Sequence, residues 1–275
     1  MKYTVQSAKY TLKNLIFLLP FAILPALFLS ISTDELAIFA VLKSVYRGTL
    51  NQWTFSNLFN SVSVFNFGSW QGAVFGFFGY VIIVPCVSLM MAILEKHFRI
   101  GKKTFNGIFG KLNDNFLSTA WYALLLAGIY ELWALLCSAF LFFVSRIPVV
   151  AVAYVFVCIV YLAMHVVLLV AVSTIYLWLP CMQITGFKAF EALHYSYHLI
   201  TSVKWRILGG QMAALFSVEI LIGLCVAFIH SQIAFLVWTT LLYSFIIMIY
   251  CVRMQMAYFD RDNIERADLA KYYSK

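Results

Sequence analysis

Charged residues are scarce in this chain, and their scarcity excludes a water-soluble protein. Only 11% of the 275 residues are charged, whereas 64% are hydrophobic. Soluble domains carry roughly 25% charged residues, and one of this length could not hide so much apolar surface from water. The sequence therefore predicts an integral membrane protein.

Paired cysteines and the common catalytic motifs are also missing. The six cysteines contain no C-x-x-C pair and lie mostly within apolar runs, so we interpret them as small core residues. Neither a disulfide framework nor a metal site is expected. The chain has no G-x-S-x-G elbow, P-loop, H-E-x-x-H or dinucleotide fingerprint, and we therefore expect no enzyme of these classes and no cofactor.

Long apolar runs dominate the sequence instead. A helix needs about 20 such residues to cross the hydrocarbon core, and continuous runs without period-two alternation exclude a β-barrel. We predict one all-α membrane domain over residues 1–275, with an external segment at 32–71 and a cytoplasmic tail at 253–275. The six spans are expected at about 15–31, 73–94, 116–144, 149–179, 207–229 and 232–252.

Two of these runs require interpretation. The first follows a basic N-terminal stretch, as in a signal peptide, but it contains Pro20 and Pro25 and no small-x-small cleavage site follows it. We interpret it as a retained, kinked helix. The fourth run is long for one span and short for a hairpin of two, so a single tilted or protruding helix is expected.

Lysine and arginine are distributed unequally over the loops, and this inequality predicts the orientation. Cytoplasmic loops of membrane proteins are enriched in these residues. With six spans, one side receives only Lys43, Arg47 and Arg146. The other side receives Lys2, Lys9, Lys13, Lys96, Arg99, Lys102, Lys103, Lys111, Lys188, Lys204, Arg206, Arg253, Arg261, Arg266, Lys271 and Lys275. Both termini are therefore predicted to be cytoplasmic.

The external segment is too long for a simple turn. Ser32 and Glu35 have the spacing of a capping box, and Gly48 is placed to end the helix that would follow. The next stretch interleaves aromatic residues with Asn and Ser, which suits the headgroup layer or a lid over the bundle. Gly68, Gly72 and Gly76 form a small-xxx-small ladder, which predicts close helix packing within the chain or between two copies.

A weak internal repeat accompanies this pattern. Amphipathic basic segments at 7–14, 104–115 and 189–205 each precede an odd-numbered span. Each segment would be an interfacial helix followed by a hairpin of two spans. The sequence thus predicts up to three helix-hairpin repeats.

Three ionisable residues, Glu131, His165 and Glu219, fall near the middle of their predicted spans. Such residues are costly in the membrane unless they are paired, hydrated or neutral. Glu131 shares a helical face with Gly128, and Glu219 shares one with Gly223, so both should face other helices. We predict an intramembrane polar centre, which serves either a proton-linked or cation-linked transport path or a structural hydrogen-bond network.

Basic and aromatic residues near the fifth span indicate lipid contact. Lys188, Lys204, Trp205 and Arg206 are placed to bind phosphate headgroups at the inner leaflet. The net charge of +8 lies in loops between spans, so anionic headgroups are expected as partners and nucleic acid is not. Glu191, His194 and His198 share a helix face, but no second motif would complete a metal site, so we expect none.

Two stretches carry a resemblance to known families: KTFNGIFGKLNDNF at 103–116, and GFKAFEALHYSYHLI at 186–200 after the W-x-P at 178–180. Residues 81–210 resemble YesL-type bacterial membrane proteins, and also the membrane domain attached to some glycerophosphodiester phosphodiesterases. The resemblance implies a small polytopic protein of the bacterial inner membrane. The chain contains no phosphodiesterase domain, so that activity is not carried over.

These patterns favour a non-enzymatic protein of the bacterial plasma membrane. It would be transporter-like, or an accessory subunit for solute or lipid handling, with the outer aromatic segment as a lid. A scaffold that binds another protein or a second copy is the first alternative. An intramembrane lipid-modifying enzyme is the other.

The predicted orientation can be tested by thiol labelling in a background without the six native cysteines. A cysteine at Lys102 should react with a membrane-impermeant maleimide only after the cells are opened, because the charge inequality places this loop inside. A cysteine at Arg47 should react in intact cells. Labelling of the Lys102 position in intact cells would overturn the orientation.

Overall fold

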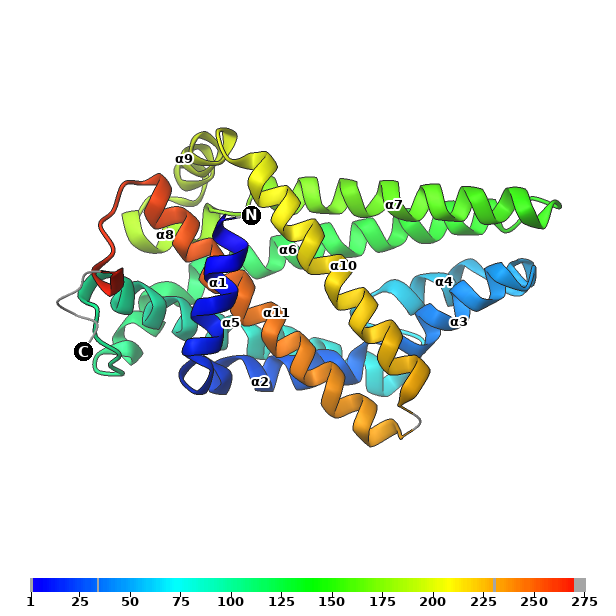
Figure 1. Ribbon diagram of the computed structural model, residues 1–275, viewed down its shortest axis with the longest axis horizontal. Coiled ribbons are helices and arrows are strands. Elements are labelled where there is room, and N and C mark those ends of the chain that lie inside the picture. The colour runs from blue at the N-terminus through cyan, green and yellow to red at the C-terminus, as the bar shows by residue number, and fades with distance from the viewer. Residues whose placement is uncertain (1, 34, 230, 270–275) are drawn as a thin grey trace.

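The computed structural model describes residues 2–33, 35–229 and 231–269, and this part of the chain is mostly helical, without strands (Figure 1). The helices are α1 (Lys2–Lys13), α2 (Leu15–Ser32), α3 (Glu35–Tyr46), α4 (Phe55–Val62), α5 (Trp70–Ile100), α6 (Ile108–Val144), α7 (Val150–Thr174), α8 (Trp178–Thr185), α9 (Ala189–Thr201), α10 (Lys204–Phe228) and α11 (Gln232–Arg261). Two short 3₁₀ turns, η1 (Leu50–Gln52) and η2 (Ala267–Leu269), complete the description.

The structure confirms an all-α membrane protein with six spans. Among the described residues, six helical stretches are long and apolar enough to cross a membrane. They contain α2, α5, α6, α7, α10 and α11. The apolar runs were thus sufficient to predict the number of spans.

The basic stretch between α5 and α6 forms a closed hairpin. Gly101 ends α5 in the left-handed region with φ of 75°, and Gly107 precedes α6 with φ of 72°. Both conformations are readily available to glycine. Glu95, near the end of α5, lies 3.1 Å from Nε of Arg99 and 3.6 Å from Nζ of Lys111.

The fourth run differs from the expectation of one long helix. α7 ends at Thr174, and α8 begins at Trp178 after a short turn. Pro180 favours the division, because a helix continuing through it would bring the proline ring against the carbonyl of Tyr176. At the third position of α8 the missing N–H costs nothing, since the first N–H groups of a helix have no intrahelical partner.

The three expected interfacial segments do not form alike. α1 and α9 are separate helices that precede α2 and α10. The middle segment instead joins α6, which continues from Ile108 to Val144 without interruption. The three-unit repeat therefore stays a prediction.

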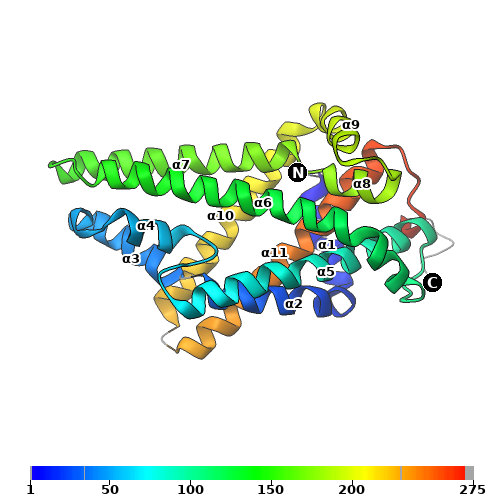
Figure 2. The same cartoon turned by 180° about the vertical axis from the view of Figure 1, so that it is seen from behind.

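Two apolar cores lie toward opposite ends of the molecule. The first joins α1, α2, α5, α8, α9 and α11, and its buried residues include Leu18, Leu94 and Phe259. The second joins α3 and α4 to the C-terminal half of α6 and to α7, through residues such as Leu58 and Leu141. Figures 1 and 2 show α6 and α7 side by side along the long axis, with α3 and α4 next to their far halves. We call the two ends the α1 end and the α3–α4 end.

Tyrosine–carboxylate hydrogen bonds close the α1 end. Tyr3 of α1 donates to Asp260 at the end of α11, and burial together with this bond raises the pKa of Tyr3 to about 12. Asp262 accepts from Tyr195 of α9 and, at 2.7 Å, from Tyr258. Lys271 and Lys275, which belong to the predicted cytoplasmic tail, lie outside the described residues.

Replacing Asp262 with alanine should loosen the α1 end, because two phenol hydroxyls would lose their acceptor. We expect the free energy of unfolding to fall by about 1–3 kcal/mol, measured by thermal or denaturant unfolding in detergent. Glu265→Ala is the matched control, since Glu265 is an exposed acid three residues away. Equal stability of the two variants would contradict the proposed role of Asp262.

Candidate functional site

A cavity of about 430 Å³ lies between α5, α6, α7 and α11. Its walls are almost entirely apolar, with Ile83, Val87, Leu126, Leu168 and Ile246 among the lining residues. The volume falls within the range of roughly 300–1,000 Å³ that is usual for ligand pockets. The cavity is therefore large enough for an apolar ligand.

The cavity is elongated along α6. Its lining residues on this helix run from Thr119 to Glu131, which corresponds to about 18 Å at 1.5 Å per residue. At the Thr119 end, the hydroxyls of Tyr122 and Tyr250 lie 2.6 Å apart. Thr119 also accepts a hydrogen bond of 2.9 Å from Gln183. The few polar groups are thus found at the ends and not along the length.

At the other end of the cavity, Glu131 binds the backbone of the external segment. Its Oε1 accepts from the N–H of Val64 at 3.1 Å, and the neighbouring Tyr130 hydroxyl donates to the carbonyl of Val62 at 2.9 Å. The other oxygen, Oε2, is buried and has no hydrogen-bond partner. Val64 and Phe65 line the cavity beside Glu131. Residues 63–65, which we call the 63–65 turn, therefore cover this end.

Ser32 and Gly76 allow the same turn to approach α2 and α5. The Ser32 hydroxyl donates to the carbonyl of Val64 and, at 2.9 Å, to that of Gly72. A Cβ on Gly76 would lie 2.6 Å from Oγ of Ser32 and 3.1 Å from the Val64 oxygen. Ser32 ends α2 and binds this turn, while the side chain of Glu35, its expected capping-box partner, lies outside the described residues.

The glycine ladder packs differently from the expectation. Gly68 precedes α5, and a Cβ there would meet Asn60; a Cβ on Gly72 would lie 2.9 Å from the carbonyl of Asn66. With Gly76, these glycines contact the external segment and not another membrane-spanning helix, except for the Ser32 hydroxyl at the end of α2. Gly79 is the glycine that faces the α2 backbone, because its Cβ would lie 3.4 Å from the nitrogen of Leu29. The sequence prediction did not include Gly79, because the spacing of glycines does not show which segment packs against each of them.

His165, which is buried, contacts the partly exposed Glu219 between α7 and α10. The Nε2 of His165 lies 3.3 Å from Oε1 of Glu219, and the same oxygen accepts from the Tyr161 hydroxyl at 2.9 Å. The Nδ1 of His165 lies 2.8 Å from the carbonyl of Tyr161, so Nδ1 carries a proton. The contact between Nε2 and the carboxyl group then requires one further proton, held on either side.

A second polar contact continues the line between α7 and α10. The Ser173 hydroxyl donates to Oε1 of Gln211 at 2.7 Å, eight residues from His165 on α7 and eight from Glu219 on α10. The spacing corresponds to about 12 Å along each helix. We call these two contacts the α7–α10 seam.

Glu131 is not part of this seam, so the three predicted residues do not form one centre. Trp133, two positions along α6, packs edge-on against the His165 ring at 5.0 Å between centroids. Two residues differ by about 200° around a helix, so Glu131 faces the opposite side and meets the 63–65 turn. Glu131 and Ser32, the last residue of α2, both bind Val64, so Glu131 lies beside the end of α2.

The expected headgroup residues lie at the start of α9 and α10. Lys188 precedes α9, and its backbone N–H donates to Oε2 of Glu191 at 3.3 Å. Lys204, Trp205 and Arg206 form the first turn of α10, where Trp205 is 79% exposed. An exposed tryptophan here is typical of a membrane interface.

The histidines of α9 pair with each other. Nε2 of His194 lies 3.1 Å from Nε2 of His198. Within the described part of the chain, no three His, Cys, Asp or Glu side chains are grouped as metal ligands would be.

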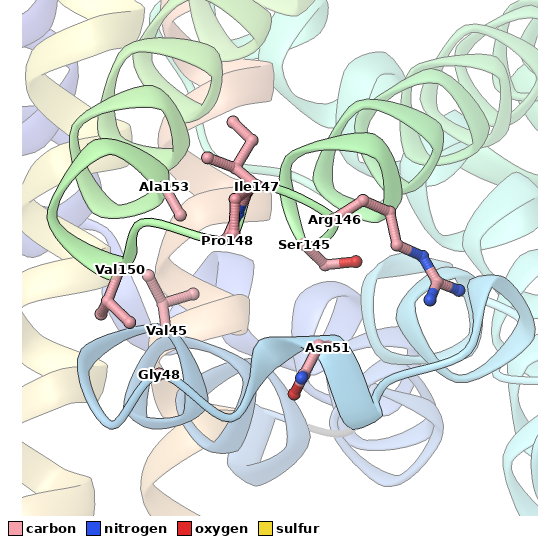
Figure 3. A pocket seen from close by; sticks show the side chains of 9 residues that line it. All are labelled: Val45, Gly48, Asn51, Ser145, Arg146, Ile147, Pro148, Val150 and Ala153. Carbon is pink, nitrogen blue, oxygen red and sulfur yellow. The ribbon is translucent and has the colours of Figure 1, made fainter.

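A second hollow of about 280 Å³ lies at the tip of the α3–α4 end. Figure 3 shows Val45 of α3 next to Val150 of α7 on one side of it, while the Arg146 side chain extends away. The guanidinium of Arg146 lies instead over the Phe142 ring, 4.7 Å from its centroid. This hollow brings no reactive groups together, so the cavity beside α6 is the stronger candidate.

Sequence reasoning did not identify Tyr176 and Tyr250 or the buried Arg253, which lie away from this hollow. Tyr176 donates to the carbonyl of Tyr250 at 3.2 Å and accepts from Nε of Arg253 at 2.9 Å. The signal was present, because tyrosines inside an apolar run need hydrogen-bond partners when they are buried.

Comparison with known proteins adds no relative. No family model, no curated protein and no solved structure matches this chain. The function must therefore be argued from the chain itself.

The packing of the 63–65 turn on Gly76 can be tested with two glycine variants. Gly76→Ala should lower the free energy of unfolding by about 1–3 kcal/mol, because the added methyl group overlaps Ser32 and the Val64 carbonyl. Gly128→Ala is the matched control on an exposed position of α6, where an added Cβ meets nothing within 4 Å. Unfolding in detergent gives the stability, and hydrogen exchange of residues 62–66 should increase only for Gly76→Ala.

Proposed function

We propose that this protein is a non-enzymatic, transporter-like or accessory protein of the bacterial plasma membrane, which takes a lipid chain into the cavity beside α6. The elongated apolar cavity carries the proposal. Both termini would face the cytoplasm, as the distribution of lysine and arginine predicts. The resemblance to YesL-type proteins stays a prediction that is consistent with this role.

The dimensions of the cavity support a chain-like ligand. Its length of about 18 Å along α6 compares with about 15 Å for half of the hydrocarbon core. The apolar walls at Ile83, Leu126 and Ile246 offer no hydrogen bond to a polar solute. A sugar or an ion bound there would lose its hydrogen bonds to water without compensation. A hydrocarbon chain makes no such bonds and would lose nothing of this kind.

The cover over the cavity supports a transporter-like role. The 63–65 turn is held by discrete hydrogen bonds from Glu131 and Ser32, next to the bond from Tyr130 to Val62. Such bonds can break and re-form without unfolding a helix. Movement of this turn would open the cavity toward the α3–α4 end, which is the predicted outer side.

The α7–α10 seam supports coupling to protons. The Nε2 of His165 and Oε1 of Glu219 lie 3.3 Å apart, which is close enough for the two groups to share a proton. α7 contributes residues both to the seam with α10 and to the wall of the cavity. α7 is therefore the element through which protonation would act on the cavity.

The proposal is tested by filling the cavity. Ala127 lines it, and Ala127→Phe would place a ring in the space of a bound chain. Two displaced methylene groups, at about 0.8 kcal/mol each, correspond to more than tenfold in affinity. We expect a photoactivatable phospholipid carrying the reactive group on its acyl chain to label wild-type α6 between residues 119 and 131, and Ala127→Phe at least about tenfold less.

Leu124→Phe is the matched control, because Leu124 is 53% exposed on the same helix and does not line the cavity. Its labelling should equal that of the wild type. Equal labelling of Ala127→Phe and wild type, or labelling confined to the outer surface of α6, would reject a lipid chain as the ligand.

A further inference from the structure

We propose that His194 and His198 of α9 form a binding site for a divalent transition-metal ion such as Zn²⁺. The site lies at the α1 end, apart from the cavity, and it does not depend on the function proposed above. The sequence predicted no metal site, because no second motif supplies further protein ligands. Two imidazoles that one helix holds together can nevertheless bind the same ion as a chelate, with water at its other positions.

The distance between two ring nitrogens is the central observation. Nε2 of His194 and Nε2 of His198 lie 3.1 Å apart, and the two ring planes meet at 84°. Zn–N bonds are about 2.0–2.1 Å long, so two nitrogens that meet on one ion at about 90–109° are about 2.9–3.4 Å apart. The two nitrogens therefore already have the separation that one shared ion requires.

The spacing of the two histidines along α9 explains this geometry. Residues four positions apart lie one turn apart on the same face of a helix. Two histidines of an H-E-x-x-H helix bind zinc with the same spacing. Both His194 and His198 are exposed, and Figure 1 shows α9 at the periphery of the molecule. An ion with its bound waters can therefore reach both nitrogens directly from solvent.

α9 is a firmly held helix, so the two histidines are in place before an ion binds. Its buried face, which includes Ala192 and Ile200, packs into the first apolar core. At its start, Nε1 of Trp178 donates to the carbonyl of Ala189 at 2.8 Å. A ligand set that is already ordered loses little conformational freedom on binding, and this favours affinity.

Glu191 supplies negative charge next to the pair. It lies three residues before His194, on the same helix face, and its Oε2 accepts from the backbone N–H of Lys188 at 3.3 Å. Within the described residues, Glu191 is not grouped with the histidines as a third ligand would be. Its carboxylate thus attracts a cation to the pair without coordinating it.

The chemistry of the two ligands determines which ions bind. Imidazole nitrogen suits Zn²⁺, Ni²⁺ and Cu²⁺, whereas Mg²⁺ and Ca²⁺ are bound by oxygen ligands. The site is therefore expected to select transition-metal ions over the common alkaline-earth ions.

The test measures Zn²⁺ binding to the full chain by isothermal titration calorimetry, on protein purified in detergent without a histidine tag. We expect saturable binding to the wild type. The affinity should fall at least about tenfold in His194→Gln and in His198→Gln, because either change leaves a single imidazole. Mg²⁺ in place of Zn²⁺ should not bind there. Zn²⁺ should also slow hydrogen exchange in α9 of the wild type, because the ion joins two successive turns.

The matched control keeps the number of histidines and changes only their spacing. His198→Gln combined with Thr201→His places the two histidines seven residues apart, about 10.5 Å along the helix, so the rings no longer meet on one ion. All three replaced side chains are exposed, so the variants should fold as the wild type does. The control should bind Zn²⁺ as weakly as His198→Gln. Wild-type affinity in any of the three variants, or no Zn²⁺ binding to the wild type, would reject the site.

Discussion

The hydrogen bonds that hold the 63–65 turn against α2, α5 and α6 are the interaction on which the rest of this structure depends. A turn without regular structure exposes N–H and C=O groups, and each such group is costly at an apolar site unless it is bonded. Here the side chains of Glu131, Tyr130 and Ser32 supply the missing partners. The turn thereby joins α6 to the α2–α5 pair, and the space between these elements is the cavity.

Polar side chains serve a similar purpose between α7 and α10. Of the six membrane-spanning stretches in the described chain, the one containing α10 has the smallest fraction of buried residues. Apolar packing alone therefore fixes it weakly. The α7–α10 seam gives it a defined register, since hydrogen bonds between helices are directional where lipid and side chains are equally apolar. His165 thus has a structural role that does not depend on whether it also exchanges protons.

Sequence patterns were sufficient for the spans, because the hydrocarbon thickness imposes a run length that can be counted directly. They were less informative about which segments meet. Glu131 and His165 both occur in the middle of apolar runs, but the angle around α6 directs Glu131 away from the seam. Gly72 and Gly76 do lie at positions of close approach, but their neighbours belong mainly to the turn just before α5 in the chain and not to another membrane-spanning helix. Arg253 was counted as one cation of a cytoplasmic tail, because composition does not distinguish a buried arginine from an exposed one.

The uninterrupted length of α6 has a mechanical consequence. Its 37 residues correspond to about 55 Å, well beyond the hydrocarbon core of about 30 Å, and the helix contains no proline. One rigid rod therefore connects the tip beside Arg146 with the wall that contains Thr119 and Glu131. A displacement of that tip is therefore transmitted along the helix to the wall of the cavity.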